Sequence, residues 1–171
     1  MERAASRIGT TFNQYSRSRL RRERLAAYLA SRTDARLILV GEAPGYSGAR
    51  VSGIPFTSER QLTGRGPAEA TATIVHRLLE ELGLEERVLL WNVVPTHPGT
   101  ASTNRPPTRA EVAAGLPFVS KIANGRVLVP VGRLAQAALG GTYLRHPSHG
   151  GAKDFRAGLI ELRDRVLPGP A

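Results

Sequence analysis

The pattern of hydrophobic and polar positions alternates between short apolar runs and longer amphipathic stretches. Runs of strand length are expected as strands over residues 37–40, 88–94, 126–131 and, more weakly, 142–145. Apolar residues recur at helical spacing in the segments expected as helices, residues 12–30, 67–82, 108–122, 132–139 and 153–167. Strands that are apolar throughout and alternate with helices are typical of a parallel sheet covered on both faces. The sequence therefore predicts an α/β fold, a three-layer α/β/α sandwich built on about four parallel strands.

The helix expected over residues 108–122 carries both a start signal and a break signal. Thr108 followed by Glu111 forms a capping-box pattern, in which each residue can bond the backbone N–H of the other. Gly115 and Pro117 stand inside the same segment, and both disfavour a regular helix. The sequence predicts a helix that begins at Thr108 and is broken or kinked near its middle.

The size and composition of the chain fit one soluble globular domain. Its 171 residues are enough for a single core, and we expect one domain over residues 1–171 with loose ends at residues 1–10 and 168–171. The absence of cysteine excludes disulfides, thiolate metal sites and a cysteine nucleophile, and it agrees with a cytoplasmic location. No apolar run approaches the roughly 20 residues that span a bilayer, so no membrane segment is expected.

The net charge of +10 is strongly basic and concentrated near the N-terminus. Residues 1–36 contain nine arginines against three acidic residues. Clustered cations gain free energy by releasing the counterions of a polyanion, which favours a nucleic-acid partner. The alternative is a compositional bias, because arginine greatly outnumbers lysine, as in proteins from GC-rich genomes.

The residues with chemical potential follow the predicted strands. Gly41 to Gly45 reads GEAPG after the first strand, Pro95 to Pro98 reads PTHP after the second, and His146 to Gly151 reads HPSHGG after the last. The carboxyl ends of parallel strands meet at one edge of the sheet, where open α/β folds bind ligands. The glycine spacing fits neither a Walker loop nor a dinucleotide-binding loop. The sequence therefore predicts one site at this edge, of another kind.

Five motifs together resemble the uracil-DNA glycosylase superfamily. They occur in that superfamily's order and span residues 37–155: GEAPG, GIPFTSE, NVVPTHP, NRPPTRAEV and HPSHGG. The first is most similar to bacterial branches that otherwise carry an iron–sulfur cluster, so this cysteine-free chain would be a member without a cluster.

The resemblance implies both a topology and an activity. It implies a four-stranded parallel sheet of order 2-1-3-4 and no metal or organic cofactor. The implied enzyme is a monofunctional uracil-DNA glycosylase, a hydrolase that flips uracil out of single- or double-stranded DNA during base-excision repair. By the same resemblance it would be monomeric, cytoplasmic and associated with the bacterial nucleoid through its DNA.

The resemblance also implies a base pocket. Phe56 would stack on the flipped uracil, and the Asn92 amide would accept from N3–H and donate to O4, an edge that cytosine reverses. The residues implied to complete this pocket are Gly41, Ala43 and Tyr46, with Tyr46 a substitute for the bulk that excludes thymine. Two alternatives stay open: Phe56 as a core plug, and Asn92 as a cap that bonds nearby backbone.

His146 and Glu42 would be the catalytic residues. An imidazole N–H of His146 aimed at uracil O2 would stabilise the charge that grows on the departing base, and one such donor is worth about 3–4 kcal/mol. Many relatives carry aspartate or asparagine where this chain has Ala43, so water positioning is assigned to Glu42, the only acid of that loop. Glu42 as a brace for the loop is the alternative.

Contacts to the DNA backbone are expected from small and basic residues of the same loops. The candidates are Ser148, His149, Gly150, Arg105, Arg109 and Ser58. His149 has three open readings, as a wedge in the duplex, a phosphate contact or a solvated side chain. His97 is a reserve candidate for water or phosphate, whereas His76 is expected to serve packing or to face solvent.

Two rival functions stay open at the level of sequence. One is a related glycosylase for another deaminated base, such as hypoxanthine or a modified uracil. The other is a non-catalytic module that binds uracil-containing DNA, which the alanine at position 43 would suit.

Overall fold

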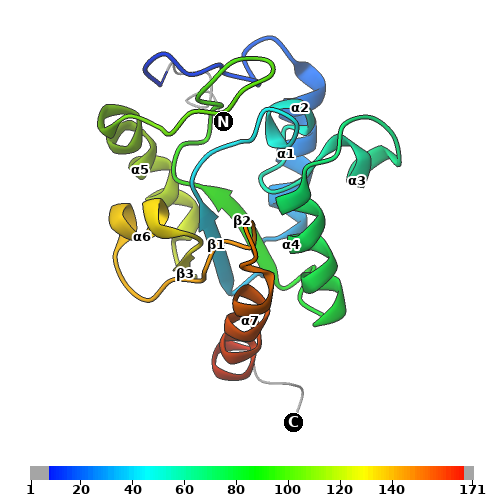
Figure 1. Ribbon diagram of the computed structural model, residues 1–171, viewed down its shortest axis with the longest axis vertical. Helices are drawn as coiled ribbons and strands as arrows, with labels where there is room; N and C mark the ends of the chain where they lie inside the picture. The colour runs from blue at the N-terminus through cyan, green and yellow to red at the C-terminus, as the bar shows by residue number, and fades with distance from the viewer. Residues whose placement is uncertain (1–7, 168–171) are drawn as a thin grey trace.

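The core of the protein is a parallel β-sheet of three strands. The computed structural model describes residues 8–167 (Figure 1). Its sheet has the order β2-β1-β3, formed by β1 (Leu37–Gly41), β2 (Val88–Asn92) and β3 (Val127–Pro130). Every residue of β1 and β2 is buried, as expected for apolar strands with helices on both faces. The three-layer α/β/α arrangement is confirmed.

The fourth strand of the predicted sheet is reduced to one residue. Leu144 makes a single parallel bridge to Val131, with its N–H donating to Pro130 O and its carbonyl accepting from Gly132 N, both at 2.8 Å. The prediction of a strand over residues 142–145 was therefore wrong in extent, although the segment lies beside β3 as the order 2-1-3-4 requires. Positive φ angles at Gly140 and Gly141 turn the chain sharply just before this point, which leaves little room for an extended strand.

Seven helices are found in the described part of the chain. They are α1 (Arg19–Ser31), α2 (Ala49–Ser52), α3 (Glu59–Thr63), α4 (Ala70–Glu81), α5 (Arg109–Ala123), α6 (Arg133–Leu139) and α7 (Ala152–Val166). One apolar cluster joins α4 and α7 to one face of the sheet, and a second joins α1, α5 and α6 to the other. Alternate residues of β1 point to the two clusters, which makes this strand the centre of both. No helix within residues 8–167 has both the length and the apolar character needed to cross a bilayer.

The first helix begins seven residues later than the sequence pattern predicted. Ser18 caps α1 by accepting a hydrogen bond from Arg21 N at 3.3 Å. Upstream of the cap, Asn13 Oδ1 accepts from Tyr15 N at 2.9 Å, a local turn that competes with helix. Phe12 instead forms an antiparallel bridge with His97. The segment before Ser18 therefore lies along the loop that follows β2.

Residues 8–10 are packed against the rest of the protein, contrary to expectation. Ile8 is buried in the second apolar cluster, and Thr10 N donates to Glu111 Oε1 at 3.3 Å. Residues 8–10 are thus tied to α5, although they were predicted to be loose. The remaining predicted loose residues, 1–7 and 168–171, lie outside the described part of the chain.

Helix α5 has the predicted start but not the predicted break. Glu111 N donates to Thr108 Oγ1 at 3.2 Å, and Thr108 N donates to Glu111 Oε2 at 2.8 Å, so the capping box is confirmed. The helix runs without interruption through Pro117. Pro117 and Ala113, whose carbonyl loses its helical partner, are both exposed, so water can satisfy that carbonyl.

Gly115 allows α5 to approach the backbone that follows β2. A Cβ at this position would overlap the carbonyl oxygen of Val93. We expect Gly115→Ala to lower the free energy of unfolding by about 1–3 kcal/mol, because the helix must move away from the sheet. Urea denaturation measures the loss, with Ser120→Ala on the exposed side of the same helix as a near-neutral control. Wild-type stability in Gly115→Ala would contradict the close approach.

Candidate active site

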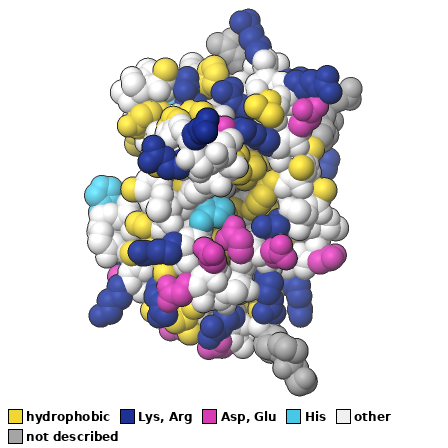
Figure 2. Space-filling model, turned by 90° about the vertical axis from the view of Figure 1, so that its right-hand side faces the viewer, with side chains coloured by type: hydrophobic (Ala, Val, Ile, Leu, Met, Phe, Trp, Pro, Cys, Tyr) yellow, Lys and Arg dark blue, Asp and Glu magenta, His cyan; other side chains and the backbone are white. Residues whose placement is uncertain are grey.

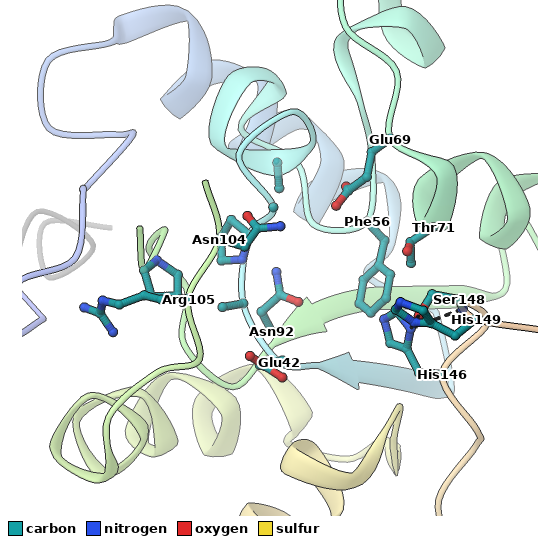
Figure 3. Close-up of a pocket in the computed structure, with 15 residues that line it drawn as sticks. Glu42, Phe56, Glu69, Thr71, Asn92, Asn104, Arg105, His146, Ser148 and His149 are labelled. Atoms are coloured by element: carbon teal, nitrogen blue, oxygen red, sulfur yellow. Dashed lines mark hydrogen bonds between the residues drawn. The ribbon is translucent and has the colours of Figure 1, made fainter. Parts of the chain in front are cut away.

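A cavity of about 300 Å³ lies at the carboxyl ends of β1 and β2. Its walls come from the loops that follow the strands and from the segments that lead into α2, α4 and α7 (Figure 3). The lining residues are Glu42, Ala43, Pro44, Gly45, Ala49, Phe56, Glu69, Thr71, Asn92, Pro98, Asn104, Arg105, His146, Ser148 and His149. The structure therefore brings together eight of the residues singled out in the sequence: Glu42, Ala43, Phe56, Asn92, Arg105, His146, Ser148 and His149.

Gly41, the last residue of β1, leaves room for the two side chains at the floor of the cavity. A Cβ on Gly41 would overlap the Phe56 ring at Cζ and lie 3.1 Å from Asn92 Oδ1. The ring and the amide therefore meet over the same glycine. The strand ends on glycine because a larger residue would push the aromatic ring into the cavity.

Phe56 has an unusual backbone for a bulky residue, with a φ of 54°. This left-handed conformation costs free energy in a residue with a Cβ, and it persists only where the surroundings fix it. The next residue supplies anchors: Thr57 Oγ1 lies 2.9 Å from His76 Nε2, and Ser52 Oγ donates to Thr57 O at 2.6 Å. His76 Nδ1 in turn lies 2.7 Å from Glu85 Oε1. His76, expected only to pack or face solvent, thus links the Phe56 loop to the loop between α4 and β2.

Asn92 presents an amide without a protein partner to the cavity. The residue is only 3% exposed, and its side chain makes no hydrogen bond to any residue in the described range 8–167. A buried polar group left unpaired costs about 1–3 kcal/mol. Since buried amides are normally bonded, this one is suited to pair with a ligand in the cavity.

His146 is held by the loop that precedes α7. Ser148 N donates to His146 Nδ1 at 3.3 Å, and Ser148 Oγ lies 2.7 Å from the same nitrogen and 2.9 Å from His149 Nδ1. Burial, followed by the neighbouring His149, lowers the pKa of His146 below its ordinary value, so the ring is neutral at pH 7. Because Nδ1 accepts from a backbone N–H, the neutral ring carries its proton on Nε2. That N–H, which bonds to no other described residue, is available to donate into the cavity.

The tight turn after His146 depends on a glycine. A Cβ on Gly151 would overlap the carbonyl oxygen of His146. His149 has a φ of 51° in the same turn, and Gly150 beside it is exposed with a φ of 79°. The turn brings both histidines to one end of the cavity, while Gly150 lies outside it.

Two carboxyl groups enter the cavity. Glu42 comes from the end of β1, and burial raises the pKa of its side chain. Glu69 comes from the segment before α4, and burial raises the pKa of its carboxyl too. The sequence pattern missed Glu69 because the helix was predicted to begin at residue 67, which hid it in the first turn; the helix begins at Ala70.

Asn104 is a second residue that the sequence did not identify. Its Oδ1 accepts a hydrogen bond from Tyr46 N at 2.9 Å, which joins the loop after β1 to the loop after β2. It begins the NRPPTRAEV motif, but the sequence assigned it no role, because its contact with Tyr46 lies 58 positions away along the chain. His97 makes a similar link: it is fully buried, with Nδ1 2.7 Å from Pro44 O and Nε2 2.8 Å from Thr100 O.

Some of the predicted site residues lie elsewhere. Tyr46 is 38% exposed and its side chain does not line the cavity. Ser58 is buried at the start of α3, where its N–H and Oγ contact Gln61 Oε1 at 2.6 and 2.5 Å. Ser58 is therefore inaccessible to a DNA phosphate in this structure. Arg109 is exposed at the first turn of α5 and outside the cavity.

Arg105 lines the cavity but is held by a buried acid. Its NH1 and NH2 donate to Glu111 Oε2 and Oε1 at 2.8 and 2.7 Å, and NH2 also donates to Thr10 Oγ1 at 3.0 Å. The hydrogen bonds from Arg105 lower the pKa of Glu111 to about 2. The pair joins the N-terminal segment, the loop after β2 and α5, so Arg105 has a structural role, and its contact with DNA stays a prediction.

The described residues contain no group of three or more His, Asp or Glu side chains placed to hold a metal ion. The polar side chains that line the cavity instead supply two amides, two imidazoles, two carboxyls, two hydroxyls and one guanidinium. This set can recognise a planar heterocycle by hydrogen bonds and stacking.

The family model described as Uracil DNA glycosylase superfamily matches residues 29–169. The chain belongs to this superfamily. Its fold is also similar to the crystal structure of wild-type Pedobacter heparinus SMUG2, with a TM-score of 0.71 and 12% identity over 95% of this chain and 96% of that one. At this identity the likeness concerns the fold alone. Among curated proteins, no sequence matches the chain.

Membership of the uracil-DNA glycosylase superfamily confirms the resemblance read from the five motifs. It supports a DNA glycosylase, a hydrolase of DNA repair that has DNA as its partner. The cavity residues that precede α7 and follow β1 and β2 are the ones that these motifs contain. The site of a glycosylase is thus expected in this cavity.

Replacing Gly41 should disable this glycosylase without unfolding it. We expect Gly41→Ala to displace the Phe56 ring, and to lower base excision by about 10-fold or more, since reacting groups held out of place by 1 Å lose up to 10²-fold in rate. Excision from labelled oligonucleotides and thermal melting measure the two properties. Gly64→Ala is the control: its φ of 73° strains the added Cβ but nothing lies within 4 Å of it, so it should lower the melting temperature and leave excision at the wild-type rate. An unchanged rate in Gly41→Ala would contradict the close packing.

Proposed function

We propose that this superfamily member is a monofunctional uracil-DNA glycosylase of base-excision repair. Its substrate is a uracil nucleotide flipped out of single- or double-stranded DNA into the cavity between Phe56, Asn92 and His146. The observation that carries the proposal is the buried Asn92 amide, unpaired within the described residues and next to an aromatic ring. An amide beside a stacking platform fits the edge and the face of one nucleobase.

Recognition of uracil follows from the arrangement of donors and acceptors. Asn92 Oδ1 accepts from uracil N3–H while the amide N–H donates to O4. Cytosine presents the opposite pattern at both positions, so in this amide orientation neither of these two groups of cytosine is paired. Each unpaired buried group costs about 1–3 kcal/mol, which disfavours cytosine.

The leaving base is stabilised by His146. As the bond between C1′ and N1 breaks, its electron pair moves onto the base, and O2 gains negative charge. The Nε2–H of the neutral imidazole donates to O2 and stabilises the uracil anion. Water then bonds to C1′, which leaves an abasic site and free uracil.

Glu42 positions that water and takes its proton. Ala43 offers no polar side chain, and Glu42 is the nearest acid on the loop after β1 (Figure 3). Burial raises the pKa of the Glu42 carboxyl, which makes its ionised form a better base. Glu42→Gln should slow turnover while leaving uracil-DNA binding intact.

DNA would approach along a basic surface. In Figure 2, Lys and Arg side chains lie in both the upper and the lower parts of the face shown, and Asp and Glu side chains form a band between them. Ser148 and His149 line the cavity and the exposed Gly150 follows them in the same turn, which supports these three residues as contacts for the phosphates beside the flipped nucleotide. We also propose that the protein acts as a monomer in the cytoplasm, at the bacterial nucleoid. Its affinity for DNA should fall as salt rises.

An assay on a panel of substrates tests the function. Labelled single- and double-stranded oligonucleotides containing uracil, hypoxanthine, xanthine or a T:G mismatch are incubated with the protein and then cleaved with alkali. Scission at uracil alone, with turnover, supports the proposal. Scission at hypoxanthine or a modified uracil would assign the site to another base. Tight binding without scission would favour a non-catalytic module, which the alanine at position 43 suits.

A further inference from the structure

The second carboxyl of the cavity, Glu69, has no role in the mechanism above. It immediately precedes α4, the place where an acidic side chain commonly caps a helix. Its side chain makes no such cap bond. The carboxyl lines the cavity instead, and it forms no hydrogen bond or ion pair with the other described residues.

Two glycines make room for this carboxyl. A Cβ on Gly45 would overlap Glu69 Oε1, and a Cβ on Gly48 would overlap Glu69 Oε2. The two carboxyl oxygens therefore fill the space that side chains on the loop after β1 would otherwise occupy. The wall of the cavity at this point is made by Glu69.

Glu69 lies across the cavity from the groups that read the base. In Figure 3, Asn92 and His146 lie on either side of the Phe56 ring, and Glu69 lies above the ring. With N3 and O4 on Asn92 and O2 on His146, the remaining edge of a pyrimidine is the one that carries C5 and C6. A base held in this way would turn that edge toward the wall that Glu69 forms.

We propose that Glu69 is the specificity-determining residue that excludes thymine, by occupying the space that a methyl group on C5 would need. The inference rests on the proposed function and assigns a role within it. The side chain of Tyr46, for which the sequence suggested this role, is exposed and outside the cavity. Glu69 is also poorly suited to an apolar neighbour, since a methyl group would strip it of water without offering a hydrogen bond.

The test compares a variant that removes the Glu69 carboxyl with a variant that keeps the size of the side chain. Glu69→Ala should excise thymine from a T:G mismatch at least 10-fold faster than the wild type, because a pocket that admits one more methyl group typically changes discrimination by about 10- to 200-fold. Uracil excision should stay within about threefold of wild type. Glu69→Gln keeps the volume, so its thymine excision should remain at the wild-type level. Tyr46→Ala should leave both rates unchanged.

A binding measurement provides a second readout. Free thymine should inhibit uracil excision by Glu69→Ala and not by the wild type, whereas free uracil should inhibit both. Thermal melting checks that each variant is folded, and Glu69→Ser carries the same expectations if the alanine variant is not. Wild-type exclusion of thymine in a folded, uracil-active Glu69→Ala or Glu69→Ser would overturn the role of Glu69, as would a Glu69→Gln variant that excises thymine as fast as Glu69→Ala. Failure of the wild type to excise uracil would instead overturn the proposed function.

Discussion

His146→Ala is expected to lower the single-turnover rate of uracil excision by about 10²–10³-fold. Removal of one preorganised donor to a developing oxyanion typically costs this much. The alanine removes the Nε2–H that the Ser148 N–H leaves available by bonding Nδ1. Affinity for uracil-DNA should change by less than about threefold, because the charge on O2 develops only as the base leaves.

His149→Ala is the matched control for this variant. His149 lies in the same turn and touches the same Ser148 hydroxyl at 2.9 Å, yet it is exposed at the mouth of the cavity. Its loss should reduce excision far less than the loss of His146. Rapid quench on a uracil oligonucleotide measures the rate, and fluorescence anisotropy measures binding. Equal losses of binding and excision in His146→Ala would remove the histidine from its assigned role.

Asn92→Asp should change which base the protein accepts. The ionised carboxylate cannot donate to O4, and its charge opposes the uracil anion, so uracil excision should fall by about 10- to 10²-fold. Protonated in a buried site, the acid can donate to cytosine N3 and accept from N4–H. The ratio of uracil to cytosine excision should therefore fall, as measured on U:G and C:G duplexes.

Asn104→Asp is the comparison for this change. Asn104 also lines the cavity, but its Oδ1 is occupied by Tyr46 N, and aspartate keeps that acceptor. Its base profile should match the wild type. A profile in Asn92→Asp that still matches the wild type would show that the base is read by other groups.

The strands and the layers could be predicted because the buried strands are short, continuous apolar runs, a pattern that the amphipathic helices do not share. β1 and β2 are buried on both faces, and their sequences contain no polar interruption before Asn92. The length of the strand predicted over residues 142–145 was overestimated. This segment has the composition of a strand, but only one of its residues pairs with a neighbouring strand. The start of α1 was misplaced because Phe12 and Tyr15 have helical spacing but local side-chain bonds turn the chain.

Site residues could be predicted from the sequence where they lie at or after the end of a strand. They could not be predicted where their role depends on a bonding partner that is distant in the sequence. Phe56, Asn92 and His146 meet because the end of β2 and the loops that carry the other two share one end of the sheet. Arg105 has the sequence context of a DNA contact, but the buried Glu111 binds it. Ser58 is similarly bound by Gln61. Whether a polar residue faces solvent or a partner depends on packing that local patterns do not encode.

The left-handed backbone of Phe56 affects the rate at which the protein can bind a flipped nucleotide. A ring whose direction is dictated by its main chain and by the anchored Thr57 has little freedom to swing away while the cavity is empty. The conformational entropy of the Phe56 side chain is therefore lost when the protein folds, and little more is lost when a nucleotide binds. A flipped base would meet a finished platform, and the delay in each encounter would come from the deformation of the DNA.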